Sequence, residues 1–333
     1  MFDITYSKLQ PVSNLLFTVT RQEHEGLLKS PNDQHNLGKH PEEWVEILRR
    51  AAKAGKQAIE KNYDFNSRTS VVKRGVGGDL TLKIDEASES AIHQSLLQDL
   101  GEGSFVFVSE EIGEIKTRGN ETRPVIFCDP LDGSHNALVG VPLFSISVAV
   151  LGLNRSIGPT GQRYLGDVDV GLIESVPSDD EFYAIKSQGS FHNRERLGRF
   201  NLPALDARFQ TIGIECGDVD FLKIVMKKLT SRSVYKLRVL GSAAMSYCML
   251  ANETFDGFIF VQPNGARTID SPAGYLIAQE AGRVFTDLFG KLTSLDRVKL
   301  GFDSRINIVG AKDRKTLSRL IRILNMKNSR LGN

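Results

Sequence analysis

The first strongly periodic segment of the chain begins at Pro41, after about forty residues with weak periodicity. From there to Ile59, apolar residues recur at intervals of three and four, which is the spacing of an amphipathic helix, and proline is favoured in the first turn. A second helix is predicted from about Asp85. Short β-branched or alternating runs predict strands at 104–108, 125–128 and 144–151. We therefore expect the first half to be helices packed on a sheet.

The second half alternates more regularly between strand-like and helical patterns, which is typical of an α/β fold. Strands are predicted at 168–174, 181–185, 211–214, 258–261 and 306–309, and helices at 219–229, 243–251, 272–281 and 314–325. Turn-forming residues cluster at 154–166. We accordingly predict an N-terminal extension at 1–40 outside the core, an N-terminal lobe at 41–155 and a C-terminal lobe at 156–326.

Composition and charge narrow the function classes. The 42 Lys and Arg residues nearly balance the 40 Asp and Glu residues, so no overall field draws in nucleic acid or an anionic membrane. The longest apolar stretch, 141–153, is shorter than the roughly 18 residues that a membrane span needs. The N-terminus lacks the pattern of a secretory signal. Cys128, Cys216 and Cys248 are widely spaced, which suits reduced thiols in a cytoplasmic protein.

Carboxylates stand at the ends of several predicted elements. They are Asp79 and Asp85 around LTLKI, Glu110 and Glu111 after SFVFV, Asp129 and Asp132 after VIFC, and Asp270 before a helix that opens with Ser-Pro. Each one alone is explained by a helix cap, a turn or a solvated loop. Together they match the several hard oxygen ligands that a two-metal phosphoryl-transfer site needs.

The segment CDPLDGSHNAL, 128–138, combines two kinds of site. Asp129, Asp132 and the backbone carbonyl of Leu131 could hold a cation. The amides of Gly133 and Ser134, at the start of a predicted short helix, would offer N–H groups to a phosphate. A cation site and an anion site are therefore expected side by side.

The segments GGDLTLKIDE, VSEEIG, DPLDGSHN, VLGSAA and TIDSPAGYLIAQEAG, in this order, resemble the inositol monophosphatase superfamily, which also holds fructose-1,6-bisphosphatases. The resemblance covers roughly 41–325 and departs from the family pattern at Arg283, beyond the last helix of the motif. It implies a layered α-β-α-β-α sandwich, hydrolysis of phosphate monoesters with two or three Mg²⁺ per site, and a homodimer.

The resemblance also implies residue roles. A water held by metal and Glu111 would be the nucleophile, its proton handled by Ser134, which Asp85 orients. Glu110 would be a supporting or third-metal carboxylate. Asp79 would not bind metal itself but would orient the metal ligands through hydrogen bonds. The implied metal ligands are Glu111, Asp129, the Leu131 carbonyl, Asp132 and Asp270, with Glu110 as the supporting carboxylate.

The substrate is less clear from the sequence. Pro263 stands where inositol-selective relatives usually carry glutamate. The chain instead has Arg238 and Arg267, a pattern similar to that of archaeal enzymes that hydrolyse both fructose 1,6-bisphosphate and inositol 1-phosphate. Each arginine is also explained as a surface charge with a packed stem. The predicted substrate-binding residues are Asp132, Gly133, Ser134, Arg238, Ser242, Ala243 and Arg267.

Three alternatives stay open. The first is a 3'-phosphoadenosine 5'-phosphate phosphatase, although His135-Asn136 stands where such enzymes usually place a lysine. The second is a catalytically silent, metal-binding homologue, although the acidic set is complete. The third is a nucleic-acid-binding protein, for which the short basic segment 191–200 is the candidate. A small-molecule sugar phosphate therefore remains the expected partner, with no nucleic acid and no membrane.

Overall fold

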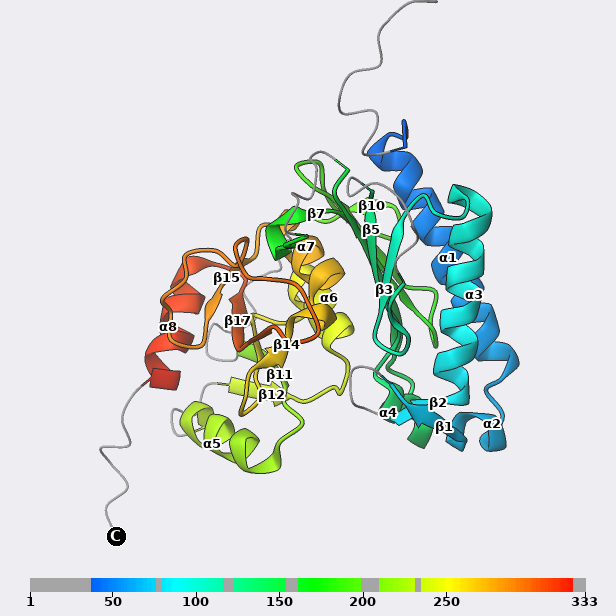
Figure 1. The fold of residues 1–333 in the computed structure, drawn as a ribbon. Helices are drawn as coiled ribbons and strands as arrows, with labels where there is room; N and C mark the ends of the chain where they lie inside the picture. Colours follow the sequence, from blue (N-terminus) through cyan, green and yellow to red (C-terminus); the bar gives the residue numbers. More distant parts are fainter. Residues whose placement is uncertain are drawn as a thin grey trace, which may run out of the picture. The chain divides into compact units, whose positions relative to one another are not determined.

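The computed structural model describes residues 37–75, 80–115, 123–153, 161–198, 210–230 and 235–325. These residues form helices and sheets in alternating layers (Figure 1). The outer helical layer holds α1 (Pro41–Lys61) and α3 (Lys83–Leu100), with the short α2 (Phe65–Thr69) between them in sequence. The hairpin of β1 (Val71–Arg74) and β2 (Leu80–Leu82) leads into α3.

The first large sheet has eight strands in the order β10-β9-β8-β7-β6-β5-β3-β4. Only the β3 and β5 pair is parallel among its described strands, and the other neighbours are antiparallel. The short α4 (Ser134–Val139) follows β5. The strands are β3 (Val106–Ser109), β4 (Gly113–Ile115), β5 (Val125–Asp132), β6 (Ser145–Leu151), β7 (Val168–Ser175), β8 (Glu181–Ile185), β9 (Gly189–His192) and β10 (Glu195–Arg196).

The second large sheet has five strands in the order β12-β11-β13-β17-β15, of which β12, β11 and β13 run parallel. Its strands are β11 (Gln210–Glu215), β12 (Tyr235–Arg238), β13 (Gly257–Phe260), β15 (Val284–Asp287) and β17 (Ile308–Ala311). The remaining elements are α5 (Val219–Thr230), α6 (Ala243–Ala251), α7 (Pro272–Glu280), α8 (Arg314–Asn325), the 3₁₀ turns η2 (Leu165–Asp167) and η3 (Thr268–Asp270), and the β14 (Ala266–Arg267) and β16 (Arg305–Ile306) pair.

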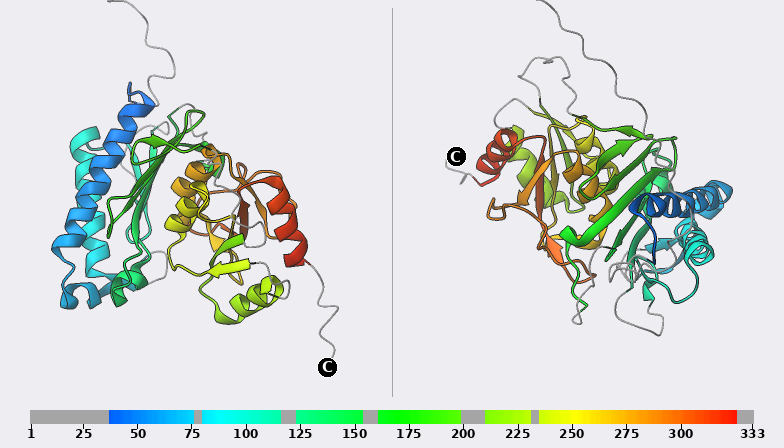
Figure 2. Two further views of the ribbon diagram at one scale, coloured as in Figure 1. Left: turned by 180° about the vertical axis from the view of Figure 1, so that it is seen from behind. Right: turned by 90° about the horizontal axis from the view of Figure 1, so that it is seen from above.

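The buried apolar residues lie between these layers. One core joins α1 and α3 to a face of the first sheet, and another joins the opposite face to α6 and α7 and to the second sheet. A third lies between the second sheet, α5 and α8. Figure 2 shows the same layering from behind and from above. Strands β6 and β7 are buried along their whole length, because helices cover both faces of the sheet.

Two local features fix α1 on the rest of the structure. A Cβ atom built at Gly55 would lie 2.8 Å from Ile92 Cγ1, so glycine is needed where α1 crosses α3. Arg49 donates to both carboxylate oxygens of Glu181 in β8, at 2.6 and 2.8 Å, and this pair is buried. The helix that the sequence predicts from Pro41 is thus attached to both its helical neighbour and the sheet.

The layered α-β-α-β-α sandwich predicted from the resemblance is confirmed. The predicted helices and strands are present, with α3 beginning two residues before Asp85 and β17 lying two residues after its expected start. The first sheet continues across residue 155, where we placed a lobe boundary, because β6 pairs with β7. Residues 1–36 of the predicted extension, and Asp79, lie outside the described residues.

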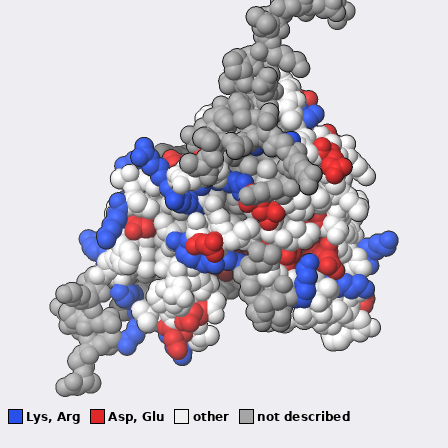
Figure 3. Space-filling model, in the orientation of Figure 1, with Lys and Arg blue, Asp and Glu red and all other residues white. Residues whose placement is uncertain are grey.

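The described residues also bear on helix hydrophobicity and on surface charge. Among the described residues, none of the helices is both long and apolar enough to cross a lipid bilayer. On the described part of the face in Figure 3, basic and acidic side chains are interspersed, as the near-equal totals of 42 and 40 lead one to expect.

Candidate active site

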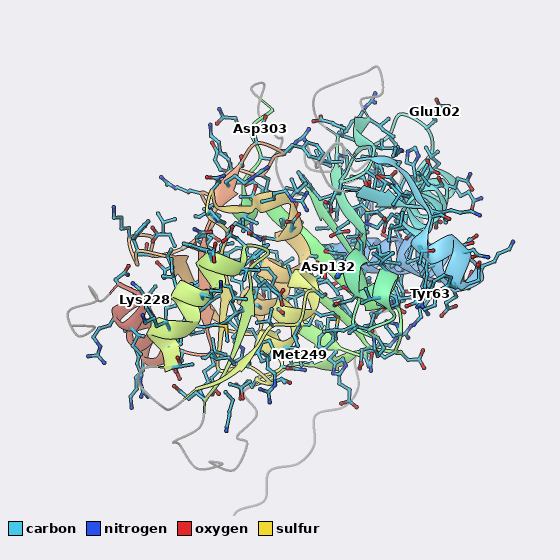
Figure 4. The ribbon with its side chains drawn as sticks, turned by 90° about the horizontal axis from the view of Figure 1, so that it is seen from below. Tyr63, Glu102, Asp132, Lys228, Met249 and Asp303 are labelled. Atoms are coloured by element: carbon cyan, nitrogen blue, oxygen red, sulfur yellow. The ribbon has the colours of Figure 1, made fainter. Side chains whose placement is uncertain are left out.

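Four of the predicted carboxylates come together from three separate elements. Glu110 follows the end of β3, Asp129 and Asp132 lie in the last four residues of β5, and Asp270 ends η3, directly before α7. Strands β3 and β5 are parallel neighbours, so their carboxyl ends meet at one edge of the first sheet. In Figure 4, Asp132 lies near the middle of the view, whereas Glu102, Lys228 and Asp303 lie toward its edges.

The charge of Asp270 raises the pKa values of the other three carboxyl groups, which shows that the four lie close together. Burial, the charge of Asp270 and other neighbours raise the pKa of Glu110 to about 8. Burial and the charges of Glu110, Asp132 and Asp270 hold the pKa of Asp129 well above its usual range. Burial, opposed by a hydrogen bond from Ser242, raises the pKa of Asp132 to about 6. The site therefore concentrates negative charge in a place poorly reached by water.

Asp132 also connects the site to the start of α6. Its carboxylate accepts hydrogen bonds from the backbone N–H groups of Ala243 at 3.0 Å and Ala244 at 3.1 Å, and from the hydroxyl of Ser242. Ser242 is the N-cap residue of α6, and its own hydroxyl accepts from the Met245 N–H. The predicted substrate-binding turn at Ser242 and Ala243 is thus in direct contact with a predicted metal ligand.

The two adjacent glutamates after β3 face different neighbours. Glu110 lies among Asp129 and Asp270, whereas Glu111 accepts a hydrogen bond from the hydroxyl of Thr81 in β2. Glu111 also lies near enough to Asp85 for its charge to raise the pKa of that group. Of the two glutamates, Glu110 is therefore the one whose charge acts on Asp129. This differs from the sequence-based assignment, in which Glu111 was the main ligand.

Asp85 and Ser134, the predicted proton-handling pair, lie close together, but each has its hydrogen bond to a backbone group. The Ser134 hydroxyl donates to the carbonyl of Leu131 at 2.7 Å, so the predicted carbonyl ligand already has a partner. Asp85 Oδ2 accepts the Leu82 N–H at 2.6 Å. Burial raises the pKa of Asp85 to about 7, and the nearby Ser134 hydroxyl opposes this shift. Asp85 can therefore gain or lose a proton near neutral pH.

Gly133 lies in the left-handed region, with φ +86°, between Asp132 and the short helix α4. A Cβ atom at this position would lie 3.1 Å from the Leu143 carbonyl oxygen. Both the backbone conformation and the close approach favour glycine. The turn lets the chain leave β5 and present Ser134 beside Asp85.

The two predicted substrate arginines are placed differently. Arg267 is paired with two site carboxylates: its Nη2 lies 2.5 Å from Glu110 Oε1, and its Nε lies 3.2 Å from Asp270 Oδ2. Arg238 is exposed at the end of edge strand β12, and its guanidinium donates to the carbonyl of Leu237. The structure therefore brings Arg267 to the acidic cluster. Arg238 lies on the exposed edge strand, four residues before Ser242 in the sequence.

Two further residues hold the substrate-side turn, and sequence reasoning did not find them. Glu215, buried at the end of β11, accepts the N–H groups of Leu240 at 3.3 Å and Gly241 at 3.0 Å. From the other side, the Asn136 side chain donates to the Leu240 carbonyl at 2.7 Å. An acidic residue that ends an apolar strand, TIGIE, was the available signal for Glu215. Its partners lie 25 and 26 residues away, which the local pattern does not reveal.

A cavity of about 970 Å³ is found elsewhere, at the far end of α7 from Asp270. Gln279 and Glu280, the last residues of that helix, lie in its wall together with Tyr164, Lys186 and Arg297. It does not include the acidic cluster. The chemistry of the carboxylates therefore locates the candidate active site better than the size of this cavity does.

The donor set fits a divalent cation. All four clustered side chains are carboxylates, the hard oxygen ligands that Mg²⁺ prefers, and each is partly or fully buried with like charges beside it. Within the described residues, however, no three acidic, histidine or cysteine side chains are close enough to hold an ion as they stand. Arg267 lies between two of them in this arrangement.

Comparison with known proteins finds relatives over most of the chain. The family model described as "Inositol monophosphatase family" matches residues 40–327. A fructose-1,6-bisphosphatase/inositol-1-monophosphatase of Methanothermobacter thermautotrophicus is 29% identical over 272 residues, which are 80% of this chain and 91% of that protein. A bifunctional NADP phosphatase/NAD kinase of Methanococcus maripaludis is 27% identical over 273 residues, 80% of this chain. The match covers 47% of that bifunctional protein, so the chain spans about half its length.

Among solved structures, the extragenic suppressor protein suhB from Bartonella henselae superposes with a TM-score of 0.68. It is 23% identical in sequence, and the match covers 85% of this chain and 98% of that one. At this level of identity the likeness concerns the fold alone. It agrees with the layered sandwich described above.

Proposed function

The chain belongs to the inositol monophosphatase family, and on that premise we propose that it is a phosphatase that uses Mg²⁺ to hydrolyse small sugar phosphates. Fructose 1,6-bisphosphate and inositol 1-phosphate are the proposed substrates. The observation that carries the proposal is the meeting of Glu110, Asp129, Asp132 and Asp270, which come from three separate elements. The charge of Asp270 contributes to the raised pKa values of the other three. Such a cluster costs stability unless it serves a cation.

Bound Mg²⁺ would supply a lowered pKa for a water molecule and neutralise charge on the phosphate. The chain's own contribution is to position and to move protons. Asp85, with a pKa near 7, can accept a proton that the adjacent Ser134 hydroxyl relays. Asp132 is held by the N-terminus of α6, so the ligand and the substrate-side turn keep a fixed relation.

Two features support a sugar phosphate as substrate. One relative, of which the match covers 91%, is named a fructose-1,6-bisphosphatase/inositol-1-monophosphatase. In addition, Arg267 places a guanidinium at the acidic cluster, where it could meet a phosphate group. The complete acidic set argues against a catalytically silent homologue, and the absence of a lysine after DPLDGS argues against a 3'-phosphoadenosine 5'-phosphate phosphatase.

The test is release of inorganic phosphate from a panel of fructose 1,6-bisphosphate, inositol 1-phosphate, adenosine 3',5'-bisphosphate and NADP. Each is assayed with Mg²⁺ and with excess chelator. We expect Mg²⁺-dependent turnover, fastest with one of the first two substrates. A preference for either nucleotide would reject the sugar-phosphate proposal, and no turnover of any substrate would reject the enzyme.

We also propose a homodimer in the cytoplasm, without nucleic-acid or membrane partners. All three cysteines are free thiols, which suits a reducing compartment. Light scattering on the purified chain measures the oligomeric state directly.

A further inference from the structure

Arg267 is a positive charge placed among predicted metal ligands. It ends β14 and directly precedes η3, so the same short segment supplies both the guanidinium and Asp270. Its guanidinium contacts an oxygen of Glu110 at 2.5 Å and an oxygen of Asp270 at 3.2 Å. All three side chains are largely buried, with exposed fractions of 20%, 14% and 13%. A guanidinium in this position compensates part of the charge that the clustered carboxylates carry.

The charge balance changes when metal binds. Glu110, Asp129, Asp132 and Asp270 together carry four negative charges when ionised, and Arg267 offsets only one of them. Two divalent cations would offset all four. The guanidinium would then be a surplus positive charge beside the metals, repelled by them and no longer required by the carboxylates. A phosphate dianion is the group that such a displaced arginine would meet best.

We propose that Arg267 is a mobile counter-ion of this site: it pairs with Glu110 and Asp270 before metal binds, and metal binding releases it toward the phosphate of the substrate. The inference rests on the proposed function and concerns how the site is assembled. Arg267 thereby opposes metal binding and favours phosphate binding. These two effects have opposite signs, which a purely structural role would not produce.

The experiment uses the full-length chain and the substitution Arg267→Gln, which removes the charge and keeps a polar side chain. Titration of MgCl₂ is followed by calorimetry without substrate. Loss of the competing guanidinium should tighten Mg²⁺ binding by roughly tenfold, equivalent to about 1.4 kcal/mol. At saturating Mg²⁺, binding of inorganic phosphate should weaken by roughly tenfold for the loss of one charge-assisted contact.

Arg305→Gln is the matched control. Arg305 lies directly opposite Arg267 in the β14 and β16 pair, is exposed, and donates to the backbone carbonyls of Phe302 and Ser304. Its replacement should change neither binding constant. Arg267→Lys keeps the charge without the planar guanidinium that reaches two carboxylates, so its Mg²⁺ affinity should fall between those of the parent chain and Arg267→Gln.

Each result separates this inference from the proposed function. Unchanged or weaker Mg²⁺ binding by Arg267→Gln, with normal binding by the parent chain, would show that Arg267 is a fixed brace and would overturn the inference alone. Failure of the parent chain itself to bind Mg²⁺ would reject both. Thermal unfolding in chelator shows whether Arg267→Gln is folded, and if it is not, Arg267→Lys decides the sign of the effect on Mg²⁺ binding.

Discussion

Asp132 is expected to serve the metal site and the fold at once, and two substitutions separate these roles. Its carboxylate accepts three hydrogen bonds from the start of α6, from the N–H groups of Ala243 and Ala244 and from the Ser242 hydroxyl. Asp132→Ala leaves all three donors without this acceptor. Asp132→Asn keeps the shape and an amide oxygen, so it loses the charge and about one acceptor position.

The expected stabilities follow from two opposing effects. Each buried donor left without a partner costs about 1 to 3 kcal/mol, so Asp132→Ala loses roughly 3 to 9 kcal/mol before water enters the gap. Burial raises the pKa of Asp132 from 3.8 to about 6. A shift of about two units means that the charged form costs about 3 kcal/mol at neutral pH, and both substitutions recover this. Without metal, we expect Asp132→Asn to stay within about 1 to 2 kcal/mol of the parent chain and Asp132→Ala to unfold about 3 kcal/mol more easily.

The assay is urea unfolding in chelator and again in excess Mg²⁺, together with phosphate release. Ligand at one hundred times its dissociation constant stabilises a native protein by about 2.7 kcal/mol. Both variants should lose most of this Mg²⁺-dependent stabilisation and most of their turnover, because a charged ligand is gone.

Asp129→Asn is the control for the structural role. Within the part of the chain that the structure describes, its carboxylate accepts a single hydrogen bond, from the Leu131 N–H at 3.0 Å. Burial and neighbouring charge hold its pKa well above the usual range. This variant should lose the response to Mg²⁺ without losing stability in chelator. The reasoning about α6 is refuted if Asp132→Ala is as stable in chelator as Asp129→Asn, and the metal assignment is refuted if either asparagine variant keeps normal turnover.

Three further predictions concern the proton pair, the substrate-side turn and the substrate. Ser134→Ala and Asp85→Asn should each lower kcat more than they raise KM. The double variant should lose little more activity than the less active single variant, and if the two losses simply multiply, Asp85 has no part in the mechanism. Burial raises the pKa of Glu215 to about 7, so the native state holds its proton more tightly than the unfolded chain, whose value is near 4.5. Stability from this group is therefore present below about pH 4.5 and lost as the pH rises through 7, and urea unfolding of Glu215→Gln should show a flatter pH dependence. Arg238→Ala should slow hydrolysis of fructose 1,6-bisphosphate by about tenfold or more and barely affect a small monophosphate, as measured by phosphate release; equal losses on both would contradict a role at a second phosphate.

The fold was predictable because its elements carry strong local signals. The apolar face of the helix that begins at Pro41 is buried as expected. Asp85 lies in the first turn of α3, where it accepts the Leu82 N–H. The lobe boundary was not predictable from turn formers. Strands β6 and β7, which precede and follow these turn formers in the sequence, pair in one sheet, and a cluster of turn formers looks the same in sequence whether it joins two strands or two domains.

The acidic set was also predictable as a group, because its members follow apolar strands or, for Asp270, directly precede a helix. Which glutamate of the adjacent pair faces the other carboxylates was not. Glu110 and Glu111 lie in the turn between β3 and β4, where side chains do not follow the alternation of a strand, so the local pattern does not say which of them faces the site. The structure answers this through long-range contacts, with Thr81 beside Glu111 and Asp270 beside Glu110.

The substrate-side turn explains why the site depends on both sheets. Asp132 belongs to the first sheet, and Glu215 belongs to the second. Glu215 accepts the N–H groups of Leu240 and Gly241, and the next residues of the same turn donate to Asp132. Asp132, a predicted metal ligand, is therefore oriented through this turn by a residue of the other sheet. The geometry of the acidic cluster requires that the two sheets be packed, which ties the chemistry to the formation of the central core.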